Sequence, residues 1–127
     1  MRYQADPLLD QRIAAIVRGL GMSHISLERV RCVRSTGSKS RRTLARVHGV
    51  PKVIQLGLNL PAHYVIEVLS ENFDRLSRED QVRTLIHELL HIPHSFGGGF
   101  RHHRPHVNRK TVEQAYRAYQ ESPAASW

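Results

Sequence analysis

The stretch His87-Glu88-Leu89-Leu90-His91 constrains this chain more than any other. It lies on an apolar stripe with three- and four-residue spacing, which predicts an amphipathic helix. The stripe consists of Val82, Leu85, Ile86, Leu89 and Leu90. Ser77 can cap the start of this helix, and Pro93 ends it, because a proline disfavours helical geometry in the preceding residue. His87 and His91 then lie one turn apart on one face, where two imidazoles can bind a single metal ion.

Two histidines and an intervening glutamate at this spacing are typical of a hydrolytic zinc site. Such a site takes three protein ligands and leaves the fourth position for water, whose pKa the metal lowers to about 7. Glu88 follows the first ligand and can accept the proton of that water. An ordinary amphipathic helix with two incidental histidines is the alternative, but a further histidine cluster just beyond the helix argues against it. The sequence therefore predicts a zinc hydrolase site with His87 and His91 as ligands and Glu88 as the base.

The third ligand is expected from the segment after the helix, where Gly97-Gly98-Gly99 allow the chain to double back. The candidates in this segment are His94, His102, His103 and His106. His94 leaves little chain in which to turn. A histidine-rich tail with generic metal affinity is the alternative interpretation. Glu113 is a less favoured third ligand, since a carboxylate from a following helix can also complete such a site.

Length and composition indicate one globular domain, residues 1–127, with a single core. No apolar run approaches the roughly 20 residues that a membrane span requires, so no membrane partner is expected. The first residues lack the apolar segment of a signal peptide, which makes a cytoplasmic location the expectation. Cys32 is the only cysteine, so neither an intrachain disulfide nor a cysteine-rich zinc framework is possible.

The net charge of +8 comes from two basic segments. The first runs from Arg29 to Lys52 without an acidic residue, and the second contains Arg101, Arg104, Arg109 and Lys110. Basic surface attracts nucleic acid through its phosphates, so nucleic-acid contact is one expectation. The alternative is a solvated basic surface or one suited to an acidic substrate, because no recognised nucleic-acid-reading motif accompanies the charge.

Hydrophobic patterns predict an α+β arrangement. Helices are expected at 7–20 and 111–120, and strands at 30–34, 44–48, 52–58 and 64–69. Asp6 caps the first helix, and the loop composition of 35–42 predicts a hairpin between the first two strands. Glu67 is expected to face solvent or a basic partner. The strand 64–69 is the candidate edge strand that would bind a substrate backbone by strand addition.

With these residues identified, the chain resembles the small zincin-type metallopeptidases found in archaea and phages. The resemblance rests on His87-Glu88-Leu89-Leu90-His91-Ile92-Pro93, the glycine-rich turn and Phe100-Arg101-His102-His103, with weaker support from residues 32–40 and 64–67. Such proteins resemble the catalytic core of SprT-like minimal metalloproteases, some of which act on DNA-bound proteins. The resemblance implies a zincin-like fold, in which a small, mostly antiparallel sheet packs against the active-site helix and N- and C-terminal helices. It also implies zinc held by three histidines and places the third ligand at His103, with His102 and His106 as alternatives.

We therefore expect a zinc metalloendopeptidase that hydrolyses protein or peptide substrates through a zinc-bound water activated by Glu88. The metal ligands would be His87, His91 and His103. Candidates for stabilising the oxyanion are Arg101, His102, His106 and Tyr116. The alternatives are a non-catalytic, zinc-containing nucleic-acid-binding module and a protease that acts on DNA-bound proteins. The enzyme is favoured because structural zinc sites are usually four-coordinate and cysteine-rich.

Overall fold

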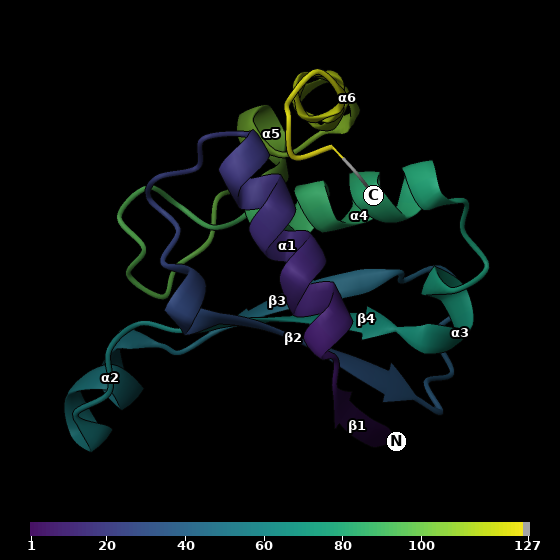
Figure 1. The fold of residues 1–127 in the computed structure, drawn as a ribbon. Coiled ribbons are helices and arrows are strands. Elements are labelled where there is room, and N and C mark those ends of the chain that lie inside the picture. Colours follow the sequence, from purple (N-terminus) through teal and green to yellow (C-terminus); the bar gives the residue numbers. More distant parts are fainter. Residues whose placement is uncertain (126–127) are drawn as a thin grey trace.

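A four-stranded sheet with helices stacked over one face makes up the computed structural model, which describes residues 1–125 (Figure 1). The strands are β1 (Arg2–Ala5), β2 (Val30–Thr36), β3 (Ala45–Gly49) and β4 (Tyr64–Leu69). The helices are α1 (Pro7–Gly19), α2 (Lys52–Leu58), α3 (Ser70–Phe73), α4 (Arg78–Leu90), α5 (His103–His106) and α6 (Arg109–Gln120), and a short 3-10 helix covers Leu27–Arg29. The expected α+β class is confirmed, and α1, α4 and α6 correspond to the three predicted helices.

The strand order is β1-β2-β4-β3, so β4 is central and β3 forms one edge. The two outer pairs are antiparallel. The central β2–β4 pair is parallel, because Val30 lies opposite Tyr64 and Ser35, further along β2, lies opposite Leu69, further along β4. The sheet is therefore mostly antiparallel, as expected. The short β1 was not predicted, because its four residues are all exposed and carry no alternating apolar pattern.

Two expectations about strand pairing are wrong. The strands at 30–34 and 44–48 do not form a hairpin, because β2 and β3 each pair with β4, which lies between them. Residues 64–69 are the central strand and not an edge. The physical reason is burial. Tyr64, Ile66 and Val68 are at most 1% exposed on the face that meets the core, and Glu67 and Leu69 on the other face are at most 3% exposed, as expected of an inner strand.

The predicted strand at 52–58 is instead the helix α2. None of its residues is buried, so its apolar side chains carry no pattern set by packing. Pro51 precedes the helix, and Asn59 ends it in the left-handed conformation. The Gln55 side chain donates hydrogen bonds to the carbonyls of Val50 and Gly97, which ties α2 to the glycine-rich loop. In Figure 1 the helix projects from one end of the sheet.

The core lies between the sheet and the helices α1 and α4, with α6 packed on α4 (Figure 1). Asp6 caps α1 by accepting a hydrogen bond from the Leu9 amide at 3.0 Å, as predicted. Asp10 accepts one from the Cys32 amide at 2.7 Å, which joins α1 to β2. Asn108 and Thr111 form a capping box at the start of α6. Among the described residues, no helix has both the length and the apolar character needed to cross a bilayer.

Candidate metal centre

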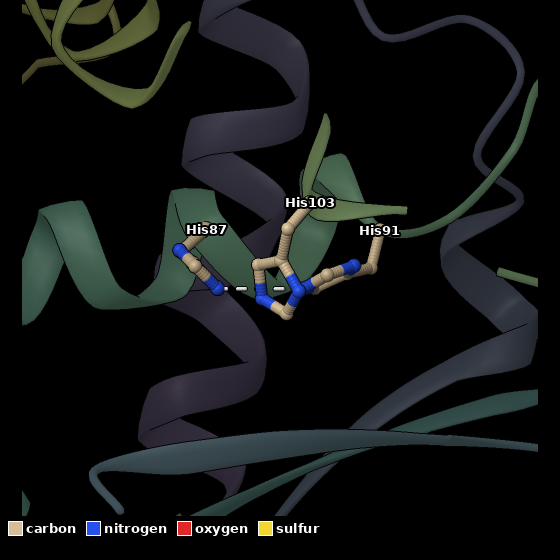
Figure 2. A group of neighbouring side chains, drawn as sticks. All are labelled: His87, His91 and His103. Atoms are coloured by element: carbon tan, nitrogen blue, oxygen red, sulfur yellow. Dashed lines mark hydrogen bonds between the residues drawn. The ribbon is translucent and has the colours of Figure 1, made fainter. Parts of the chain in front are cut away.

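Helix α4 fixes the position of the first two histidines. The Ser77 hydroxyl accepts a hydrogen bond from the Asp80 amide at 3.1 Å and caps the helix as predicted. The apolar side chains of Val82, Leu85, Ile86 and Leu89 are buried in the core and fix the rotation of the helix. His87 and His91, one turn apart, are therefore only partly buried and point toward each other (Figure 2).

The structure brings His103 to these two rings. The Nε2 atoms of His87 and His91 lie 3.3 Å apart, and the ring of His103 is centred 5.4 Å and 4.6 Å from theirs. One ligand nitrogen of each residue lies within 4.8 Å of the others. Tetrahedral zinc with bonds of about 2.0–2.1 Å separates neighbouring ligand nitrogens by about 3.3 Å. The three converging imidazoles in Figure 2 therefore fit a divalent metal such as zinc.

Hydrogen bonds from the returning chain orient His91. Its Nδ1 donates to the Arg101 carbonyl at 2.8 Å, and the Arg101 amide donates to the His91 carbonyl at 2.7 Å. Because Nδ1 carries the proton, the lone pair of Nε2 is free to bind a metal. The same two bonds fix the chain two residues before His103, which places this third imidazole beside the helix.

The glycine-rich loop can double back because of its backbone geometry. Gly98 has a φ of +100°, and a Cβ at this position would lie 2.3 Å from the Val50 carbonyl oxygen. The buried Tyr64 hydroxyl donates to the Gly99 carbonyl at 2.7 Å and accepts from the Gly98 amide at 2.8 Å. The loop is thus held against the end of the sheet, and only glycine fits at position 98.

The surroundings of the two helix histidines, His87 and His91, keep them neutral. Burial, together with the neighbouring His91 and His103, lowers the pKa of His87 to about 4. Burial also lowers the pKa of His91, and the charge of His103 acts in the same direction. Both rings are therefore unprotonated near neutral pH, which is the form that binds metal.

Glu88 is buried beside this histidine group. The carboxyl is 6% exposed, and its Oε2 lies 3.8 Å from the Nε2 of His87. Burial raises the pKa of Glu88 to about 8, although a hydrogen bond from the Val47 backbone amide opposes the shift. A metal cation at the three imidazoles would lower this pKa again by its charge. A carboxyl that titrates close to neutral pH can both accept and return a proton.

The other histidines considered as third ligands have different partners. The ring of His94 stacks on His24, with centroids 4.3 Å apart. His106 accepts a hydrogen bond from the Arg101 guanidinium at 2.6 Å. His102 is exposed and precedes α5. Among the described residues, the group that can hold a metal contains His87, His91 and His103.

Glu113, a candidate third ligand, and Tyr116, a candidate for stabilising the oxyanion, both contact Arg83. Glu113 forms an ion pair with this guanidinium at 3.0 Å. The ring of Tyr116 lies beneath it, 4.1 Å from ring centroid to guanidinium carbon, and its hydroxyl accepts a hydrogen bond from Gln120. Val47, whose amide meets Glu88, carries no sequence signal, because no motif marks a residue that acts through its backbone.

Comparison with known proteins gives a family. A family model described as "Putative phage metallopeptidase" matches residues 1–119. No curated protein and no solved structure matches this chain. The matched region includes α4, the glycine-rich loop and all three clustered histidines. The metallopeptidase family implies a divalent metal, for which the three imidazoles provide ligands. This chain belongs to the phage metallopeptidase family.

Proposed function

We propose that the protein is a zinc-dependent endopeptidase in which His87, His91 and His103 hold the metal and Glu88 is the general base. The observation that carries this proposal is a buried carboxyl 3.8 Å from one of three imidazoles whose ligand nitrogens lie within 4.8 Å of one another. Three neutral nitrogen ligands suit zinc and leave one position open to solvent.

Proton transfer is the task of Glu88. When bound, zinc would polarise a peptide carbonyl and acidify a water molecule. The Glu88 carboxylate accepts the proton of the attacking water and then delivers it to the leaving amine nitrogen. Its burial suits both steps, because the same environment that raises its pKa keeps bulk water from exchanging the proton.

The edge strand β3 is positioned to bind the substrate backbone. Leu44 and Val50 flank this strand; the Leu44 carbonyl accepts from the amide of Leu69 at the end of β4, and the Val50 amide donates to the carbonyl of His63 just before β4. The alternate residues Ala45, Val47 and Gly49 therefore direct their backbone groups outward. The Val47 amide already meets the carboxyl of Glu88 on this outer side. A substrate strand added to β3 would therefore place a peptide bond beside the base and the metal ligands.

A purely structural zinc site is less well supported. Structural sites are usually closed by four protein ligands, whereas the described residues bring three together. Such a site also has no use for a buried carboxyl with a pKa near 8 beside the ligands.

The test compares two glutamates on the same helix. Glu88→Gln should retain one zinc per chain, measured by atomic absorption, and reduce the cleavage rate of unfolded casein by about 10²- to 10⁴-fold. Glu79→Gln, at the exposed first turn of α4, is the matched control and should cleave at the wild-type rate. Removing zinc with a chelator should stop cleavage, and adding it back should restore it. Equal cleavage by zinc-loaded Glu88→Gln and wild type would refute the mechanism.

A second candidate, a protease that acts on DNA-bound proteins, is favoured by the position of the basic residues. Arg42 and Arg109 line the same cavity as Glu88, and the neighbouring Arg41 is exposed. DNA held by these cations would bring its bound proteins to the metal centre. A gel shift with duplex DNA that weakens with salt and with Arg41→Ala/Arg42→Ala supports this candidate. No shift at low salt would rule it out.

A further inference from the structure

A large cavity opens directly beside the catalytic carboxyl. It has a volume of about 760 Å³. It lies between the start of β3, the start of α6 and the face of α4 that carries Arg83, Thr84 and His87. His87 and Glu88 form one end of it, while Leu44, Ala45, Leu76 and Val112 provide apolar walls. A cavity of this size accepts a bulky side chain together with the adjoining backbone. What it accepts depends on its charges.

Of the three acidic side chains that line the cavity, Asp80 and Glu113 are paired, and Glu88 lies at the end beside His87. Arg83 binds Glu113 through Nε at 3.0 Å and through Nη2 at 3.3 Å, and it binds Asp80 through Nη1 at 3.0 Å. The two carboxylates share one guanidinium, which offsets one of their two negative charges and occupies both oxygens of Glu113 and one of Asp80, so they offer few positions to a cationic side chain. Apart from Glu88, the remaining charges are Arg42 and Arg109, both exposed; together with Arg83 they outnumber Asp80 and Glu113 and disfavour lysine and arginine. The walls and charges together favour a neutral, apolar side chain.

The direction of β3 decides which substrate side chain reaches this cavity. The cavity adjoins Leu44 and Ala45, whereas Glu88 meets the strand further along, at Val47. A strand that adds to β3 in the antiparallel sense, as β4 does on the other side, runs from Gly49 toward Ala45. The residue that follows the bond beside Glu88 then lies next to the cavity.

We propose that this cavity is a specificity pocket for a bulky apolar side chain on the C-terminal side of the scissile bond. The proposal rests on the proposed peptidase function and names its substrate class. Cleavage should occur before leucine, phenylalanine or methionine and should be rare before lysine or arginine. Thr84 also lines the pocket from α4 and is only partly buried, so a larger residue can be placed there without entering the core.

The first experiment maps cleavage sites. The zinc-loaded protein is incubated with a mixed peptide library, and the products are sequenced by mass spectrometry. The wild type should prefer leucine over alanine after the cleaved bond by at least about 10-fold. Thr84→Phe should reverse this preference toward alanine, and Val112→Phe should do the same from the opposite wall. Cleavage without a preference at this position, or with the apolar preference before the bond, would overturn the pocket while leaving the peptidase function intact.

The second experiment measures binding without turnover. Two short peptides carry a hydroxamate as metal-binding group at the N-terminal end, followed by either leucine or alanine, and calorimetry gives their affinities for the zinc-loaded protein. The leucine compound should bind wild type at least about 10-fold more tightly, and Thr84→Phe should abolish the difference. Discrimination in a protein that cleaves no peptide would support the pocket and refute the peptidase function. Equal binding of the two compounds would overturn the pocket.

Discussion

Two glutamates are buried in this molecule, and their surroundings push their pKa values in opposite directions. Glu67, on β4, is 3% exposed, and Glu88, on α4, is 6% exposed. Burial alone would raise both pKa values. Around Glu67 this effect is outweighed by hydrogen bonds from Ser35 at 2.6 Å and His48 at 2.8 Å and by the charge of Arg46, so its pKa is lowered. For Glu88 burial dominates and raises the pKa to about 8.

The difference separates a structural carboxylate from one suited to proton transfer. Glu67 is held ionised by partners on both neighbouring strands, since Ser35 belongs to β2 and His48 to β3. It therefore links the edge strand to the centre of the sheet. Glu88 has few partners and lies beside the three clustered histidines, where its carboxyl can gain and lose a proton. The sequence predicted catalysis for Glu88 and placed Glu67 against solvent or a basic partner. The structure gives Glu67 the basic partners Arg46 and His48 but buries its carboxylate, which no motif marks.

Zinc binding at the histidines beside Glu88 should produce the largest effect. Metal at the three histidines should stabilise the fold by about 4 kcal/mol when free zinc is 1,000-fold above its Kd. His103→Ala should lose this stabilisation, whereas His106→Ala, a neighbouring histidine outside the group, should keep it. Urea unfolding with and without zinc measures both. Zinc stabilisation that survives in His103→Ala but not in His106→Ala would assign the third ligand to His106.

Removing the structural carboxylate should produce the next largest effect. Glu67→Ala leaves Ser35, His48 and Arg46 without their shared acceptor and should lower the free energy of unfolding by about 3 kcal/mol. The exposed Glu28→Ala is the control and should change stability little. Peptidase activity per folded molecule should remain near wild type in both variants, because Glu67 does not contact the metal ligands.

In metal-free protein, removing the charge of Glu88 should raise the free energy of unfolding, whereas removing that of Glu67 lowers it. The unfolded chain ionises this carboxyl near pH 4.5, whereas the folded chain retains its proton up to about pH 8. Stability of the wild type therefore falls as pH rises between these values. Glu88→Gln removes this loss and should be more stable than wild type by at least about 2 kcal/mol at pH 8, with no difference at pH 4. Denaturant curves in a chelating buffer at both pH values provide the check.

The smallest effect is the acid sensitivity that Glu67 contributes. Its lowered pKa means that the ionised form stabilises the fold above pH 4.5, and this contribution disappears as the pH falls through the folded-state value. Glu67→Gln should therefore reduce the difference in unfolding free energy between pH 6 and pH 3 by about 1 kcal/mol. If the unfolding free energy of this variant falls between pH 6 and pH 3 by as much as that of the wild type, other carboxylates account for the loss of stability.

The parts of the fold predicted from sequence are those set by local signals. Helix α4 has a serine cap, a stripe of buried side chains and a terminating proline, all within one segment. The pairing of β4 between β2 and β3 depends instead on contacts between distant segments, which no local pattern contains. In α2 the apolar residues are not buried, so their spacing does not follow the helical repeat, and a strand was predicted there instead.

In the candidate site, too, the residues on one helix could be predicted from local sequence, whereas those positioned by distant segments could not. His87, Glu88 and His91 are brought together by the turn of one helix, which the sequence specifies directly. The choice among the later histidines depended on a family resemblance, because the path of the glycine-rich loop is set by Tyr64 and Val50 on the sheet. The cavity beside Glu88, proposed above as a specificity pocket, was not predicted, since α4, α6 and the residues before β3 form it jointly.

The projecting helix α2 has a practical consequence for handling the protein. Val53, Leu56 and Leu58 are 74%, 86% and 67% exposed, and no acidic residue lies within the helix. Such a surface favours self-association and precipitation at the concentrations that crystallisation and NMR require. Replacing Leu56 and Leu58 with glutamate would add negative charge to this otherwise strongly basic chain at a place remote in sequence from the metal ligands. That double variant is the form in which to look for soluble, concentrated material.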